Sequence, residues 1–149
     1  MKTVIITGGN SGLGYYCAQE IAQNKDWYVI IACRNQEKAT QAVQKLQEQT
    51  SSDRLTTMLL DLASLVSIRQ FAQEFACEDF PPLGAIVCNA GVQFIQRQTY
   101  TEDGFEETFA VNHLGHFLLV NLLLKRLVAP ARIIFVSSDT HDPDKITFN

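Results

Sequence analysis

The chain of 149 residues carries a net charge of −4, and 46% of its residues are hydrophobic while 19% are charged. This length suits one domain, spanning 1–149, that can bury a sizeable core, and the acidic balance argues against nucleic acid or an anionic membrane as a partner, because both favour a basic surface. No apolar run approaches the ~20 residues that cross a bilayer, and the first three residues lead straight into an apolar run without the layout of a signal peptide, so the sequence predicts a cytoplasmic protein that is not transmembrane.

The first predicted strand, 3–7, is apolar and β-branched, and it runs into a loop with four glycines before a helical pattern at 12–24. Glycines let the backbone approach a ligand closely, and the start of a helix offers free N–H groups to an anion. The spacing Gly8-x3-Gly12-x-Gly14 differs from the G-x-G-x-x-G dinucleotide fingerprint. The arrangement still predicts a phosphate-binding loop, whose candidate residues are Gly8, Asn10, Ser11, Gly12, Leu13 and Gly14.

The rest of the chain continues the alternation of strands and helices. Apolar runs predict strands at 27–32, 55–60, 85–88 and 132–136. Helical periodicity predicts helices at 36–49, at 65–75 with Ser64 as its cap, and at 101–127 with a bend near 112–115. Continuous apolar strands between helices indicate the α/β class, with a doubly wound parallel sheet in the order 3-2-1-4-5, the Rossmann fold, and the sequence stopping after the fifth strand.

Polar or glycine-containing motifs follow each predicted strand. The glycine loop follows the first, Arg34 the second, Asp61 the third, Asn89 the fourth and Ser138 the fifth. Ligands on such a sheet bind at the carboxyl ends of the strands, near the switch point between strands one and four. The coincidence predicts one shared ligand site at that edge.

The end of the second strand predicts the cofactor. An NAD enzyme places an acid there to hold the ribose 2′-OH, but this chain has Arg34 followed by Asn35. An arginine can bind a 2′-phosphate in bidentate fashion, whereas an acid would repel it. We therefore expect NADP(H), with an exposed arginine that merely opens a helix as the alternative.

Two further motifs have both local and ligand-binding interpretations. Asp61 and Leu62 suit a turn before the next helix, where a carboxylate is favourable anyway. The tripeptide Asn89-Ala90-Gly91 is a loop signal, although its small residues would let the backbone pass close to a ligand and its amide could join neighbouring strands.

Metal and disulfide sites are not expected. His113 and His116 have a spacing that could hold a metal, but no third ligand is evident. The four cysteines are scattered without a C-x-x-C pair, so we interpret them as small buried hydrophobes in a reducing compartment.

Taken in order and spacing, Thr7-Gly8-x3-Gly12-x-Gly14, Asn89-Ala90-Gly91 and the serine pair that ends at Ser138 resemble the short-chain dehydrogenase/reductases over essentially the whole chain. The resemblance implies that Asp61 accepts from the adenine amino group of the cofactor. It further implies that Asn112 distorts its helix and holds a water of a proton relay, and that Ser138 orients the substrate carbonyl.

The same family uses a tyrosine as proton donor and a lysine four residues later that lowers its pKa, because a free tyrosine has a pKa of ~10. None of the four tyrosines here has a lysine at that spacing. The chain thus carries the cofactor half and one catalytic serine, and we expect it to be inactive alone.

Within the family, Ala32-Cys33-Arg34 and the segment 112–119 are most similar to light-dependent protochlorophyllide reductases and retinol-dehydrogenase-like enzymes. These are NADPH enzymes with large apolar substrates, so we expect an apolar carbonyl or related substrate here.

Three functions stay open at this point. The chain is the N-terminal portion of an NADP(H)-dependent oxidoreductase, a non-catalytic NADP-binding module or degenerate paralogue, or a flavodoxin-like domain with no dinucleotide, which would require the motifs to coincide by chance. An in-frame Tyr-x-x-x-Lys beyond codon 149 would favour the first over the second. We also expect self-association, because strand 132–136 is an apolar open edge and helix 101–127 is apolar on more than one face.

Overall fold

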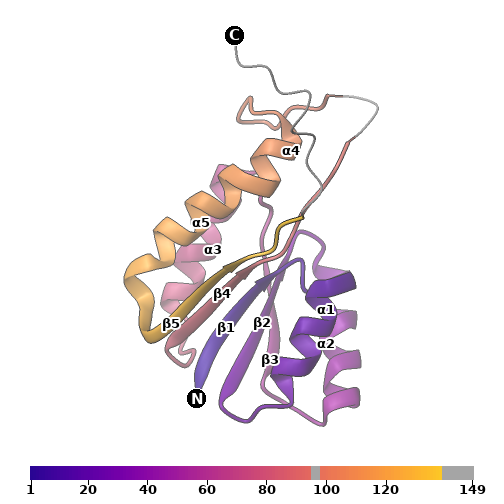
Figure 1. The fold of residues 1–149 in the computed structure, drawn as a ribbon, viewed down its shortest axis with the longest axis vertical. Coiled ribbons are helices and arrows are strands. Elements are labelled where there is room, and N and C mark those ends of the chain that lie inside the picture. The colour runs from indigo at the N-terminus through magenta and orange to yellow at the C-terminus, as the bar shows by residue number, and fades with distance from the viewer. Residues whose placement is uncertain (95–97, 139–149) are drawn as a thin grey trace.

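A five-stranded parallel sheet runs through the computed structural model, which describes residues 1–94 and 98–138 (Figure 1). The order β3-β2-β1-β4-β5 confirms the predicted doubly wound topology. All pairings are parallel, with Val4 opposite Val29 and Ile5 opposite Ile86. The strands are β1 (Lys2–Thr7), β2 (Trp27–Cys33), β3 (Leu55–Leu59), β4 (Leu83–Cys88) and β5 (Leu127–Phe135).

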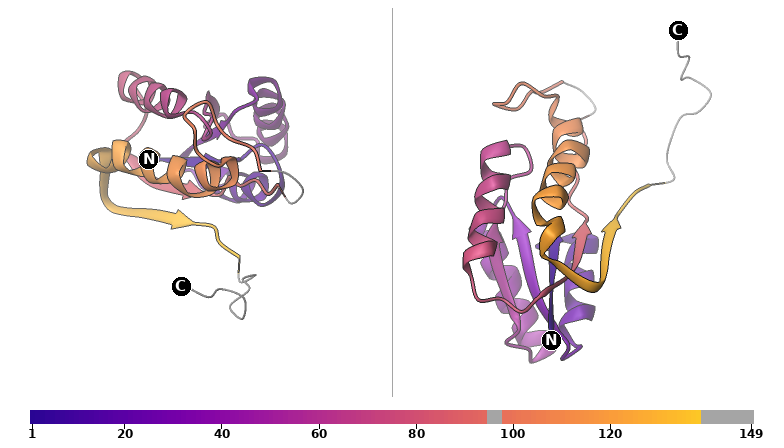
Figure 2. Two further views of the ribbon diagram at one scale, coloured as in Figure 1. Left: turned by 90° about the horizontal axis from the view of Figure 1, so that it is seen from above. Right: turned by 90° about the vertical axis from the view of Figure 1, so that its left-hand side faces the viewer.

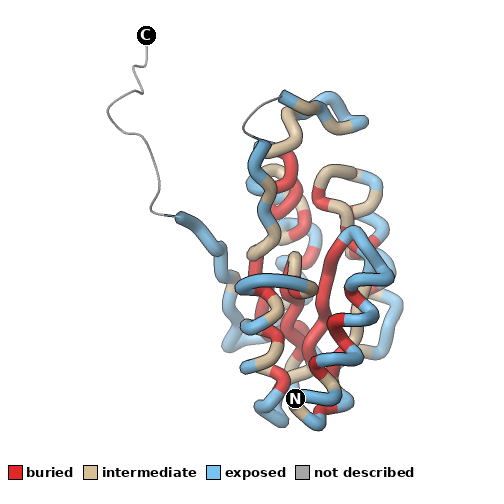
Figure 3. The backbone as a smooth tube through the Cα atoms, turned by 90° about the vertical axis from the view of Figure 1, so that its right-hand side faces the viewer, coloured by how far each residue is buried: buried red, intermediate tan, exposed pale blue. Residues whose placement is uncertain are grey.

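Helices cover both faces of the sheet, α1 (Gly12–Ala22) and α2 (Gln36–Thr50) on one side and α3 (Leu65–Cys77) and α5 (Gly115–Leu123) on the other (Figure 2). The strands supply both layers because successive side chains point to opposite faces. Val4 and Ile6 pack with the first helix pair, whereas Ile5 packs with the second, and all three are buried. The buried stretches therefore follow the central strands and the inner faces of the helices (Figure 3).

The fourth helical segment is shorter than the predicted 101–127. It comprises α4 (Glu107–Phe109), a π-helical turn at Ala110–Leu114, α5 and a 3₁₀ turn at Leu124–Arg126. The π-helical turn lies where we expected a bend. Residues 101–106 instead form a tight turn, in which Gly104 has φ +83° and Thr101 accepts from the N–H of Phe105. The helix begins after Glu106, whose carboxylate accepts from the N–H groups of Thr108 and Phe109.

Strand β5 begins five residues earlier than predicted. Leu127 pairs with Leu83, an irregular stretch follows, and regular pairing resumes with Arg132 opposite Ala85, which is where we expected the strand to start. Long-range pairing of Leu127 thus extends the strand across Pro130, ahead of the run that predicted it. No helix among the residues described here is long and apolar enough to cross a membrane.

Candidate functional site

A cavity of about 590 Å³ lies at the carboxyl ends of β1 to β4. The predicted cofactor-binding residues belong to four separate motifs, and all of them except Gly12 and Gly14 line this cavity. Its lining consists of Gly8, Asn10, Ser11, Leu13, Ala32, Cys33, Arg34, Asn35, Lys38, Leu60, Asp61, Leu62, Asn89, Ala90, Gly91, Val92 and Val111.

The glycine loop needs its glycines for two different reasons. Gly8 and Gly12 have φ +65° and +55°, which side chains rarely adopt. No side chain fits at Gly14, because a Cβ there would lie 2.6 Å from the Gly8 carbonyl oxygen and 2.5 Å from the Asn89 amide nitrogen. The missing side chain thus allows α1 to start directly against the loop.

The start of α1 differs from those of α2 and α3. Asn35 caps α2 by accepting from the N–H of Lys38, and Ser64 caps α3 by accepting from the N–H of Ser67. Ser11, at the start of α1, makes no such side-chain bond. The first N–H groups of α1, which have no partner within the helix, therefore remain for an anionic ligand.

The end of β2 supplies the positive charge of the cavity. Arg34 is exposed, and it forms no ion pair with any residue in the described part of the chain. Lys38 lines the same cavity from the first turn of α2. We did not predict Lys38, although its position four residues after Arg34, on the exposed side of a helix that follows the strand, could have indicated it.

Asp61 combines the two interpretations that its sequence allowed. Its Oδ1 atom accepts from the N–H of Ala63 at 2.9 Å, as expected of a turn residue, while its own N–H donates to the Ser67 hydroxyl. The half-buried residue also lines the cavity together with Leu62. The turn thus fixes the carboxylate at the cavity wall.

Asn89 joins β1 and β4, as the sequence suggested. Its side-chain Nδ2 donates to the carbonyl oxygen of Thr7 at 3.0 Å, and its backbone N–H donates to the Thr7 hydroxyl at 2.9 Å. Ala90 follows closely, because a Cβ on Gly8 would lie 3.0 Å from the Ala90 Cα. The two strand ends therefore form one rigid wall of the cavity.

Asn112 lies beside the cavity rather than in it. Its side chain makes a double hydrogen bond with Val92, accepting from the N–H at 2.8 Å and donating to the carbonyl oxygen at 2.9 Å. Since Val92 lines the cavity, the π-helical turn that carries Asn112 is connected directly to the cavity wall.

Ser138 is the one predicted residue on the far strand. It is exposed, follows β5 and does not line the cavity. Its carbonyl oxygen accepts from the Ser137 hydroxyl at 3.3 Å.

The two histidines of the helical segment have different surroundings. The exposed His113 ring contacts the ring of Phe109, whereas the His116 ring is buried against Thr7. No group of three potential metal ligands occurs among residues 1–94 and 98–138. Burial raises the pKa of the Cys33 thiol, and it raises that of Cys88 to about 12, so neither is an activated nucleophile.

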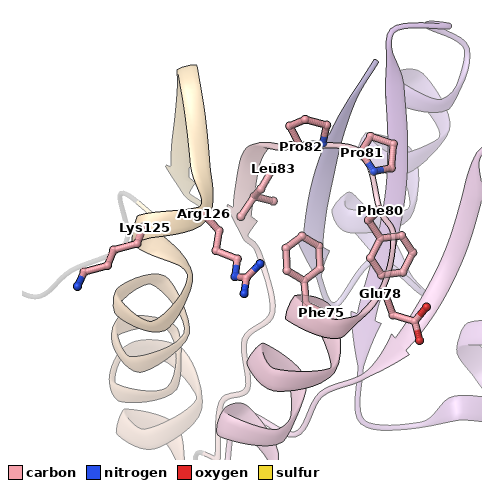
Figure 4. Close-up of a pocket in the computed structure, with 8 residues that line it drawn as sticks. All are labelled: Phe75, Glu78, Phe80, Pro81, Pro82, Leu83, Lys125 and Arg126. Atoms are coloured by element: carbon pink, nitrogen blue, oxygen red, sulfur yellow. The ribbon is translucent and has the colours of Figure 1, made fainter.

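A second hollow of about 400 Å³ lies at the opposite end of the sheet (Figure 4). It combines apolar and charged residues from the end of α3, the start of β4 and the 3₁₀ turn, and it contains none of the predicted site residues. Its lining consists of Phe75, Glu78, Phe80, Pro81, Pro82, Leu83, Lys125 and Arg126.

Comparisons with known proteins agree with the fold and the motifs. The sequence profile of the short chain dehydrogenase family matches residues 2–145. The WW domain-containing oxidoreductase of Danio rerio is 49% identical over 142 residues, 94% of this chain and 34% of that protein. Retinol dehydrogenase 13 of Homo sapiens is 45% identical over 150 residues, 99% of this chain and 44% of that protein. The chain thus spans less than half the length of these two relatives.

A solved structure from Escherichia coli CFT073, described as a short-chain dehydrogenase complexed with NADPH, superimposes with a TM-score of 0.78. The two sequences are 26% identical, and the match covers 92% of this chain and 58% of that one. The expected likeness to retinol dehydrogenases is confirmed by the human relative. From the profile match and these relatives it follows that the chain belongs to the short-chain dehydrogenase family.

Proposed function

We propose that this chain is the NADP(H)-binding portion of an oxidoreductase that moves hydride between NADP(H) and an apolar carbonyl or related unsaturated group. The observation that carries the proposal is the cavity at the strand ends, where the glycine loop, the uncapped start of α1 and two cationic side chains converge. When bound, the nicotinamide would supply or accept the hydride.

The residues present suit such a cofactor in two places. The free N–H groups at the start of α1 suit the diphosphate, and a Cβ at Gly12, the first residue of this helix, would meet nothing within 4 Å, so the space beside it is open. Arg34 and Lys38 suit the 2′-phosphate that distinguishes NADP from NAD. The NADPH complex of the Escherichia coli neighbour supports this choice. Asp61 and Leu62 would border the adenine, and Asn89, Ala90 and Gly91 the central part of the cofactor.

The first prediction concerns Arg34. We expect the purified chain to bind NADPH more tightly than NADH, and Arg34→Ala to weaken NADPH binding about ten- to a hundredfold, because a charge-assisted phosphate contact is lost. NADH binding should stay nearly constant. Calorimetry with both cofactors measures these affinities.

A matched control is Arg69→Ala, which removes an exposed arginine from α3, outside the cavity. Lys38→Ala should also weaken the binding of NADPH but not that of NADH. Its effect should be smaller than that of Arg34→Ala if the Arg34 guanidinium makes the bidentate contact. Equal affinity of the unmodified chain for NADPH and NADH would contradict the assignment of NADP.

The second prediction is that the 149-residue chain alone shows little or no activity. Of the catalytic set, it would contribute Ser138, to orient a carbonyl, and Asn112, to hold a relay water, but no tyrosine in it has a lysine four residues later. General acid–base catalysis is worth about 10²–10⁴-fold. The assay monitors the absorbance of NADPH, which falls as the cofactor is oxidised. Robust NADPH-dependent reduction of retinal or a simple aldehyde would contradict this prediction.

The second candidate is a non-catalytic NADP-binding module or degenerate paralogue, which a stop codon directly after codon 149 would favour. An apolar substrate is supported by the human relative, a retinol dehydrogenase, while the resemblance to protochlorophyllide reductases stays a prediction. The cytoplasm stays our proposed compartment, supported by four cysteines that are free thiols.

A further inference from the structure

The hydroxyl group of Thr7 is the meeting point of three segments. Its Oγ1 atom accepts from the backbone N–H groups of Asn89 at 2.9 Å and Ala90 at 3.0 Å. The same atom lies 2.8 Å from Nε2 of His116, on α5, and 3.4 Å from the carbonyl oxygen of Val87. Thr7 is completely buried and His116 is 2% exposed, so water does not compete for these bonds.

Counting donors and acceptors assigns the proton in this contact. A hydroxyl oxygen has two lone pairs and one hydrogen. Both lone pairs are used by Asn89 and Ala90, so the hydrogen is what remains. Its possible acceptors are Nε2 of His116 at 2.8 Å and the Val87 carbonyl oxygen at 3.4 Å, and the shorter distance favours His116. Nε2 must then accept, because an N–H there would meet an oxygen with no lone pair to offer.

The other ring nitrogen leads to the same assignment independently. Nδ1 of His116 lies 3.4 Å from the carbonyl oxygen of Asn112. A carbonyl oxygen can only accept, so a hydrogen on Nδ1 makes this contact favourable. Both sides of the ring therefore favour the neutral Nδ1–H tautomer, and burial, which lowers the pKa of His116, favours the neutral ring as well.

We propose that His116 is a positioning residue, which accepts the Thr7 hydroxyl proton at Nε2 and thereby holds the Asn89–Ala90 wall and the Asn112 turn in one arrangement. Thr7 ends β1, Asn89 and Ala90 follow β4 and line the cofactor cavity, and the π-helical turn reaches the same cavity through Val92. The ring contacts the end of β1 directly and the residues after β4 through the Thr7 hydroxyl. Its effect on cofactor binding rests on the proposed function, whereas its tautomer does not.

The first test therefore needs no cofactor. In the ¹⁵N-labelled chain at pH 8, two-bond ¹H–¹⁵N correlation spectra distinguish a protonated from an unprotonated ring nitrogen. We expect His116 to show a protonated Nδ1 and a bare Nε2. A protonated Nε2, or an even mixture of tautomers as in an exposed ring, would overturn the proposal, whether or not the chain binds NADPH.

The second test separates the acceptor from mere packing. His116→Gln can place an amide oxygen near the position of Nε2, whereas His116→Leu fills space without an acceptor. We expect His116→Leu to weaken NADPH binding about five- to tenfold, and His116→Gln to stay within about twofold of the unmodified chain. Thermal unfolding of each variant shows whether it is folded under the assay conditions.

The outcomes of this second test are distinct. Equal losses in the two variants, or no loss in the folded His116→Leu, would overturn the positioning role while leaving the proposed function intact. If the unmodified chain does not bind NADPH, the proposed function fails and the tautomer alone decides about His116. His113→Gln, on the exposed side of the same helical segment, is the control and should leave both readouts unchanged.

Discussion

Strands β1 and β5 both contain an apolar β-branched run, but their surroundings are opposite. The β1 sequence, KTVIIT, is buried from Thr3 to Thr7, whereas most of β5, including Ile134 and Phe135, is exposed. Strand β1 lies between β2 and β4 and between two helix layers, while β5 pairs with β4 alone among residues 1–94 and 98–138. An apolar β-branched run thus indicates a strand, but its neighbours decide whether that strand contributes to the core.

The largest expected contrast is in the cost of removing a side chain. Ile6 is completely buried, so Ile6→Ala should reduce the free energy of unfolding by about 3 kcal/mol, through lost burial and the cavity that remains. Ile134 is 44% exposed, so Ile134→Ala should cost less than about 1 kcal/mol. Urea unfolding measures both, and similar losses would show that β5 is buried in solution.

The second contrast concerns self-association. We propose that exposed β5 pairs with another copy of the chain, because its free edge is apolar. Light scattering should then show a mean mass that rises with concentration, and Ile134→Lys should suppress this rise. Leu59→Lys, which places the same charge on the opposite edge strand, is the matched control.

The helix offers the other surface for association. Phe117 is 58% exposed on α5, and Phe117→Lys tests that face separately. Suppression by Phe117→Lys alone would move the contact from the strand to the helix. A monomer at all concentrations would contradict both.

The smallest expected effect is a pH dependence of the free energy of unfolding, which arises from the buried His116 beside β1 and not from β5. Burial, the largest cause, lowers the pKa of His116 from its ordinary 6.5, and the Asn112 carbonyl partly offsets it. The unfolded chain therefore binds more protons than the folded one below about pH 6.5. The contribution of His116 to the free energy of unfolding is fully present above that pH, and it decreases as the pH falls towards the lowered pKa.

His116→Gln should remove this part of the acid sensitivity, whereas His113→Gln should retain it. The free energy of unfolding measured from pH 8 to pH 5 is the readout. Amide exchange should show acid loosening β1 and β4 beyond its general pH trend, with less effect on β5, which the ring does not contact. Identical pH profiles for His116→Gln and the unmodified chain would contradict the assignment.

Features encoded by neighbouring residues were predictable. The glycine loop, the alternation of strands and helices and the cap Ser64 follow from local patterns, since apolar runs, periodicity and cap residues act over a few positions. The meeting of the motifs from Gly8, Arg34 and Asn89 at one edge follows from the parallel sheet.

Features that depend on distant partners were not predictable. Helical periodicity predicts a helix from 101, but the Asp103 carboxylate instead accepts from the N–H of Leu65 at the start of α3. The early start of β5 depends on pairing with Leu83, 44 residues away by number. His116 was considered only as a metal ligand, although its place among apolar helical residues could have indicated burial.

The π-helical turn at Ala110–Leu114 has a consequence for insertions and deletions. A π-bulge is one extra residue within an α-helix, and each residue of an α-helix advances the helix by about 100°. Deleting one residue from this turn would restore ordinary winding at the cost of rotating either Asn112 away from Val92 or His116 away from Thr7. The number of residues in this turn is thus constrained more tightly than their identity. A library of single-residue deletions should show its sharpest loss of folded protein across these five positions.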